Sequence, residues 1–94
     1  MHAYIIHGYG ANPSDHWFPW LQARLQAAGI PTTIPPLPDS EHPDFAAWQA
    51  TLTQTISTPD RNTLLIAHSL GTISLLHYLS TTRPTAVGGL VLVA

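Results

Sequence analysis

The stretch TLLIAHSLG, residues 63–71, decides the fold and the candidate site of this 94-residue chain. It opens with an aliphatic and β-branched run typical of a buried strand, and residues 72–79 after it have the pattern of a helix. A serine in the turn between such a strand and helix, with small residues two positions before and after, is typical of a nucleophile elbow. Ser69 is that serine, flanked by Ala67 and Gly71. The stretch therefore predicts Ser69 as a catalytic nucleophile.

The residues around Ser69 have predicted geometric roles. The turn strains its central residue, and the flanking positions must be small because the strand and helix backbones crowd there. The commoner form of the motif has glycine at both places, so Ala67 departs from it by one methyl group. We expect His68 to flank the turn with its side chain pointing away from Ser69.

Short aliphatic runs alternate with longer helical patterns along the chain, which is typical of βαβ units and a parallel sheet. Strands are predicted at residues 3–6, 31–34, 62–67 and 89–93. Helices are predicted from about Pro19 to Gly29, from Pro43 to Ile56 and over 72–79. We predict an α/β fold with a doubly wound parallel sheet of about four strands and three helices, in the order 2-1-3-4.

Apolar spacing predicts which helix residues face the sheet. In the first helix the residues at this spacing are Trp17, Trp20, Leu21, Arg24, Leu25 and Ala28. The expected inward residues are Phe45, Trp48, Leu52 and Ile56 in the second helix and Ile73, Leu76 and Leu79 in the third. All three tryptophans are thus expected in the core. Asp15 or Ser14 is expected to cap the first helix.

The predicted strand order brings a second loop to Ser69. Ligands of open parallel sheets bind where the strand order reverses, which here lies between the first and third strands. The loop after the first strand contains Gly8 and Tyr9. A tetrahedral intermediate of acyl transfer needs two hydrogen-bond donors for its oxyanion. The backbone N–H groups of Tyr9 and Leu70 are at the matching positions, and Gly8 is expected to shape the loop.

Composition excludes several other functions. The formal net charge is −2, with three arginines and no lysine, so nucleic acid and anionic membranes are poor partners. The absence of cysteine excludes thiolate catalysis and sulfur-based zinc sites. Pro13 occupies the place of the third glycine of a dinucleotide-binding fingerprint, so nucleotide binding is not expected. No apolar stretch approaches the length of a membrane span and no basic leader is present, which predicts a cytoplasmic protein.

We expect the remaining polar residues near the predicted crevice to have structural roles. The spacing of His7, His16 and His68 fits no metal-ligand motif, so we expect structural roles and neither metal nor cofactor. We expect Asp15 and Asp39 to cap turns. The proline-rich connection 35–43 either borders the pocket or is an ordinary surface loop, and we favour the surface loop.

The residues after Ser69 lack two groups that a serine nucleophile needs. In the elbow-bearing fold the triad follows the chain order Ser, Asp or Glu, His. No Asp or Glu follows Ser69, and the only later histidine, His77, lies about 12 Å along the predicted helix. We therefore interpret residues 1–94 as a partial domain, truncated at its carboxyl end.

The whole chain resembles the amino-terminal half of a small α/β-hydrolase family, that of retinoblastoma-binding protein 9 and the bacterial YdeN-type serine hydrolases. Five segments carry the resemblance: Tyr4–Tyr9, His16–Leu21, Trp48, Ala67–Gly71 and Gly88–Val93. The resemblance implies a nearly lidless single domain about twice this length. It also implies that the serine nucleophile is Ser69 and that the triad Asp and His lie in the other half.

Three functional hypotheses follow. The first is a serine hydrolase of small, carboxylic esters that works through an acyl-enzyme on Ser69 and is inactive as these 94 residues alone. The second is a non-catalytic protein-interaction module, and the third is a truncated gene product without a function. The expected partners are a small-molecule ester and a second copy of the chain, bound through the exposed strand near 89–93.

Overall fold

The computed structural model describes residues 1–56 and 58–94. Within these residues, four strands alternate with three helices: β1 (His2–Ile6), α1 (Phe18–Ala27), β2 (Thr32–Thr33), α2 (Phe45–Thr55), β3 (Thr63–His68), α3 (Leu70–Thr82) and β4 (Gly89–Val93). All strand pairs are parallel, in the order β2-β1-β3-β4. The predicted fold class and strand order are confirmed.

The element boundaries differ from the predicted ones by a few residues. Strand β2 is shorter than predicted, because prolines at positions 31, 35 and 36 have no N–H group to extend a ladder. Helix α2 begins where the Asp44 carboxylate accepts a hydrogen bond from the Ala47 N–H at 2.9 Å. Helix α3 is longer than predicted and ends at Thr82, and Arg83 after it has left-handed backbone angles.

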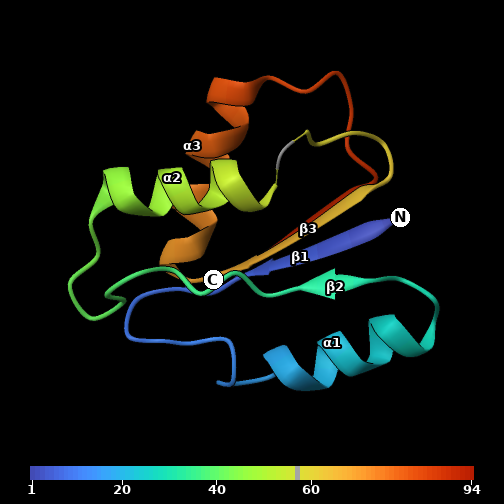
Figure 1. Ribbon diagram of the computed structural model, residues 1–94, viewed down its shortest axis with the longest axis horizontal. Helices are drawn as coiled ribbons and strands as arrows, with labels where there is room; N and C mark the ends of the chain where they lie inside the picture. The colour runs from blue at the N-terminus through green and yellow to red at the C-terminus, as the bar shows by residue number, and fades with distance from the viewer. Residues whose placement is uncertain (57) are drawn as a thin grey trace.

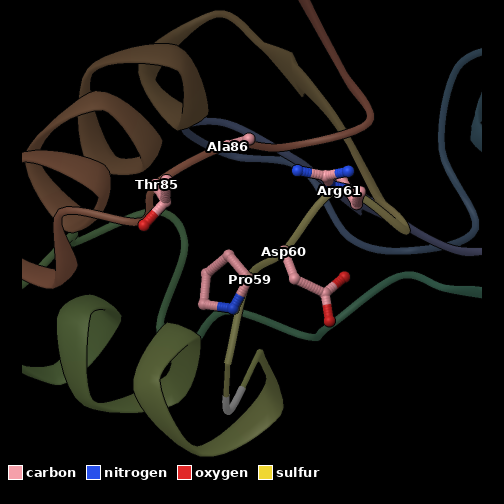
Figure 2. Close-up of a pocket in the computed structure, with 5 residues that line it drawn as sticks. All are labelled: Pro59, Asp60, Arg61, Thr85 and Ala86. Carbon is pink, nitrogen blue, oxygen red and sulfur yellow. The ribbon is translucent and has the colours of Figure 1, made fainter.

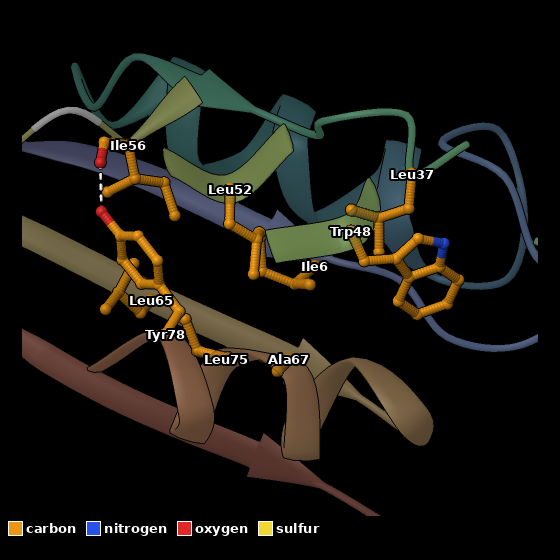
Figure 3. Packing of buried hydrophobic residues seen from close by; sticks show 9 residues of the cluster. All are labelled: Ile6, Leu37, Trp48, Leu52, Ile56, Leu65, Ala67, Leu75 and Tyr78. Carbon is orange, nitrogen blue, oxygen red and sulfur yellow. Dashed lines mark hydrogen bonds between the residues drawn. The ribbon is translucent and has the colours of Figure 1, made fainter. Parts of the chain in front are cut away.

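Helices cover both faces of the sheet, with α2 and α3 on one face and α1 on the other (Figure 1). Successive strand residues point to opposite faces, so Ile5 packs in the cluster beneath α1 whereas Ile6 packs beneath α2 and α3. Figure 3 shows the larger cluster, which is formed by Ile6, Leu37, Trp48, Leu52, Ile56, Leu65, Ala67, Leu75 and Tyr78. The Tyr78 hydroxyl donates to the Ile56 carbonyl inside it.

The predicted inward face of α3 is wrong at two of its three residues, whereas the third, Leu79, packs against the larger core cluster as predicted. Ile73 is 66% exposed and Leu76 is 44% exposed, whereas Leu75 and Tyr78 are buried. Gly71 in the first turn of α3 packs against the loop after β1 where no Cβ fits, and Leu75 and Tyr78 pack into the core cluster, so the helix is rotated toward these residues. At about 100° per residue, Ile73 then lies about 160° around the helix from Leu75.

Two aromatic residues predicted in the core are also at the surface. Trp20 is 61% exposed, with the Arg24 guanidinium 5.3 Å from its ring centre, and Phe45 is 57% exposed. Trp48 is buried as predicted, and Trp17 is half-buried.

The predicted cap of α1 is wrong. The helix begins after Trp17 without a side-chain hydrogen bond to its first turn within the described structure. The Asp15 carboxylate instead accepts from the Asn12 N–H at 3.0 Å, and the Ser14 N–H donates to the Asn12 side chain at 2.8 Å. These groups close the 12–15 turn. None of the helices in the described ranges is long and apolar enough to cross a membrane.

Candidate active site

Ser69 is the single residue between β3 and α3, and its backbone is strained. Its angles are φ 56° and ψ −129°, a region that costs a residue with a side chain about 1–3 kcal/mol. Two hydrogen bonds hold this conformation: the Ser69 N–H donates to the Val93 carbonyl at 2.9 Å, and the Thr72 N–H donates to the Ser69 carbonyl at 3.0 Å. Ser69 is exposed, and in the described structure its hydroxyl makes no capping bond to α3. The hydroxyl is therefore presented at the carboxyl end of β3.

The two loops at this end of the sheet meet so closely that side chains are excluded. A Cβ atom on Gly71 would lie 2.3 Å from the His7 carbonyl oxygen. A Cβ atom on Gly8 would lie 2.9 Å from the Ser69 Cβ and 3.1 Å from the Leu70 nitrogen. The loop after β1 is thus packed directly against the turn at Ser69, as the strand order predicts.

Both ring nitrogens of the buried His7 have hydrogen-bond partners inside the protein. The Leu37 N–H donates to its Nε2 at 2.9 Å, so the proton of the neutral ring is on Nδ1, which donates to the Gly8 carbonyl at 3.1 Å. Burial lowers the pKa of His7 below its usual 6.5, and this effect outweighs the opposing effect of the Gly8 carbonyl. His7 therefore has the structural role predicted for it.

Two backbone N–H groups near Ser69, those of Tyr9 and Leu70, lack a hydrogen-bond acceptor within the described structure. Leu70 is the first residue of α3, so its N–H has no partner within the helix. Among the described residues, neither this group nor the Tyr9 N–H donates a hydrogen bond to the backbone outside regular elements or to a side chain. The neighbouring Gly10 N–H, in contrast, is bonded to the Ser40 carbonyl at 2.8 Å.

The other histidines near Ser69 pack against the start of α1. The His68 ring centre lies 5.3 Å from that of His16, 5.7 Å from Trp17 and 5.8 Å from Phe18. Within the described structure the buried His68 Nδ1 has no hydrogen-bond partner. In the described ranges, no group of three or more His, Cys, Asp or Glu residues is placed to hold a metal ion.

Asp15 and Asp39 make hydrogen bonds within turns, as predicted. The proline-rich connection, in contrast, contacts the site more closely than predicted. Asp39 pairs with His42 at the surface, with 3.3 Å between Oδ1 and Nδ1. The 35–43 connection supplies the Leu37 N–H to His7, and its Pro43 lines a pocket. Its interpretation as an ordinary surface loop is therefore wrong.

That pocket has a volume of about 230 Å³ and lies between the start of α2 and the first turns of α3. It is lined by Pro43, Phe45, Trp48, Leu70, Ile73 and Ser74. Leu70 directly follows Ser69, so the pocket adjoins the strained turn. The sequence pattern did not indicate this pocket, because apolar spacing predicts that Phe45 and Ile73 both face the core.

A second depression lies at the opposite end of the strands. It has a volume of about 180 Å³ and is lined by Pro59, Asp60, Arg61, Thr85 and Ala86, in the loops that precede β3 and β4 (Figure 2). The Asp60 carboxylate there accepts a hydrogen bond from the Asn62 N–H at 2.8 Å. Ligands of parallel sheets bind at the carboxyl ends of the strands, so this depression is not the candidate site.

A parallel sheet of this order, with a strained serine between β3 and α3, defines an α/β-hydrolase-like protein. The chain belongs to the serine hydrolase family, whose model matches residues 3–94. It is 41% identical over 92 residues to "Putative hydrolase YdeN" of Bacillus subtilis (strain 168). It also matches the crystal structure of the ydeN gene product from B. subtilis, with a TM-score of 0.91 over 97% of this chain. The chain spans about half of these relatives, 48% of the YdeN sequence and 50% of the crystallised chain.

Proposed function

We propose that this protein is a carboxylesterase-like serine hydrolase that acts on small esters through an acyl-enzyme on Ser69. One observation carries the proposal: the exposed, strained Ser69 lies next to Leu70 and against the loop of Gly8 and Tyr9, and within the described structure the N–H groups of Tyr9 and Leu70 donate no hydrogen bond. Membership of the serine hydrolase family supports the hydrolase class. We further propose that the substrate is an ester, that the reaction passes through a covalent acyl-enzyme, and that the protein is cytoplasmic.

In the proposed reaction, the Ser69 Oγ adds to the ester carbonyl carbon as its proton passes to a base. The Tyr9 and Leu70 N–H groups donate to the resulting oxyanion, and each such donor typically contributes about 10²–10³ in rate. The C–O bond to the alcohol then breaks, and the alcohol leaves with the proton. Water adds to the acyl-enzyme in the same manner, which releases the acid and restores Ser69.

The base is not evident among the described histidines. Both nitrogens of His7 are engaged, and His77 is exposed with its ring 4.6 Å from that of Phe45. His16 and His68 pack against each other and against Phe18 at the start of α1. We therefore propose that a histidine and a carboxylate come from the half of the protein that the longer relatives have, and that residues 1–94 alone are inactive.

Substitution of the nucleophile tests the proposal in the full gene product. The Ser69→Ala variant should turn over a short p-nitrophenyl ester slower by a factor on the order of 10³ or more, since the covalent route is lost. A fluorophosphonate should label the unsubstituted protein at Ser69. The matched control is Ser80→Ala, at an exposed serine on the same helix, which should leave turnover and labelling unchanged.

The same experiment separates the hydrolase from a non-catalytic interaction module. Retained turnover in the Ser69→Ala variant would refute Ser69 as the nucleophile. A full gene product that neither hydrolyses esters nor takes the fluorophosphonate would favour the interaction module.

A further inference from the structure

Two large apolar side chains are exposed in the pocket that Leu70, the neighbour of the candidate nucleophile, helps to line. Phe45 is 57% exposed and Ile73 is 66% exposed, and both line the pocket of about 230 Å³ between α2 and α3. Apolar side chains grouped around a hollow are typical of a ligand site. We propose that this pocket binds the acyl group of the substrate, and that the substrates are esters of uncharged, apolar carboxylic acids. The inference rests on the proposed function of Ser69.

The position of Leu70 connects the pocket to the chemistry. Its N–H is one of the proposed oxyanion donors, and the residue also forms part of the pocket wall. The acyl carbon next to the ester carbonyl would thus lie at the mouth of the pocket when the carbonyl carbon is bonded to Ser69. The acyl chain then extends between Phe45 and Ile73.

The lining selects for an apolar group. None of the six lining residues carries a charge. The polar atom of the Trp48 ring is already used, because its Nε1–H donates to the Pro38 carbonyl at 2.8 Å. The Ser74 carbonyl likewise accepts from the Gln49 side chain at 2.9 Å. Of the six lining residues, only Ser74 has a side-chain polar group left to offer, and one neutral hydroxyl does not replace the water that a carboxylate or ammonium on the acyl chain would lose in this pocket.

The volume bounds the size of the acyl group. An apolar cavity of about 150 Å³ is large enough to hold a benzene molecule. The pocket here, at about 230 Å³, is larger and open to solvent. It therefore fits a short aliphatic chain or a single ring.

A binding experiment tests the pocket without any catalysis. The probes are 2-hexanone, a neutral ketone with a four-carbon chain, and 5-oxohexanoate, which carries a carboxylate at the end of its chain. Both are titrated into the Ser69→Ala variant of the full gene product while the methyl NMR signals of Leu70 and Ile73 are followed. We expect 2-hexanone to shift these signals and to bind about tenfold or more tighter than 5-oxohexanoate. Equal binding, or shifts confined to other methyl groups, would overturn the proposal.

A kinetic experiment tests the role of the pocket in selectivity. The Phe45→Glu variant places a carboxylate at the pocket wall, and the matched control Ala46→Glu places one on the next, exposed residue. Both substitutions lie in the first turn of α2, where an acidic residue is favourable, so neither should unfold the protein. We expect Phe45→Glu to lower the ratio of kcat/KM for p-nitrophenyl hexanoate over acetate by about tenfold, and Ala46→Glu to leave it within about twofold.

The two experiments separate this inference from the proposed function. An unchanged hexanoate-to-acetate ratio in Phe45→Glu, with turnover still dependent on Ser69, would overturn the acyl pocket alone. Ester turnover that does not depend on Ser69 would overturn the proposed function, and the ketone titration would still decide whether the pocket binds apolar groups.

Discussion

The Nε2 atom of His7 accepts a hydrogen bond from the Leu37 N–H at 2.9 Å, within a ring that is 1% exposed. If Nε2 were protonated, its N–H would point at the Leu37 N–H and the hydrogen bond would be lost. The pKa of His7 is lowered by burial, so the unfolded chain binds a proton more readily than the folded one. This contribution to stability is complete above the unfolded pKa of about 6.5, falls as the pH drops below it, and levels off below the folded pKa.

The prediction is checked by urea unfolding of the protein and of His7→Gln at about pH 7.5 and about pH 5. Glutamine retains an acceptor but does not titrate. The difference in unfolding free energy between the two pH values should be smaller in the variant. An equal pH dependence in both proteins would contradict the assignment of a neutral His7.

Gly71→Ala should damage both stability and the site. Its Cβ would lie 2.3 Å from the His7 carbonyl oxygen, and overpacking of this kind typically costs about 1–3 kcal/mol or more. Fluorophosphonate labelling of Ser69 in the full gene product should fall as well, because α3 must move away from the loop after β1. The control is Gly10→Ala, where the added Cβ meets nothing within 4 Å and only the φ of +68° causes strain. Equal effects of the two substitutions on the unfolding free energy would contradict the close contact.

Residues 1–94 alone should take no fluorophosphonate. Without a base, Ser69 has the reactivity of an ordinary alcohol at neutral pH. Labelling is measured beside the full gene product as a positive control. Labelling of the 94 residues would point to His16, because both nitrogens of His7 are engaged.

Residues 1–94 alone should also self-associate through β4. This strand is at the edge of the described sheet, and its Leu90, Val91 and Leu92 are 41%, 47% and 42% exposed. An apolar groove of about 390 Å³ runs beside it, lined by Trp17, Leu21, Ile66, Val91 and Val93. Such an edge favours pairing with a second copy.

Sedimentation of the 94-residue chain checks this prediction. Val91→Lys should shift the chain toward the monomer, since a charged residue on an edge strand opposes pairing. Ile73→Lys, at an exposed position away from β4, should leave the association unchanged. A cooperatively melting monomer of the unsubstituted chain would contradict the prediction.

The fold could be predicted from the sequence because strand and helix patterns alternate so regularly. Ile5 and Ile6 in β1, and Leu65 and Ile66 in β3, face opposite helical layers, which is what continuous apolar runs in a parallel sheet require. The strand order then placed the loop after β1 beside the turn at Ser69.

The orientation of side chains on the helices could not be predicted in the same way. In α3 nearly every position is apolar or small, so periodicity does not distinguish Leu75 from Ile73 or Leu76. The distinction comes from tertiary contacts, the approach of Gly71 to the His7 carbonyl and the packing of Leu75 and Tyr78 into the core cluster. The pocket beside Leu70 depends on the resulting rotation of the helix, so the sequence pattern does not indicate it.

The pairing of β1 with β3 has a consequence for how the site comes into existence. Gly8 and Ser69 are far apart in the sequence, yet they meet because Ile6 is aligned with Ala67 and Ile5 with Ile66. A slip of one residue would turn both strands' side chains to the wrong helical layers and separate the two loops. Contacts between such distant segments form late, since a long loop must close first. During refolding of the full gene product, a reactive Ser69 would therefore appear only after the centre of the sheet has reached its native alignment.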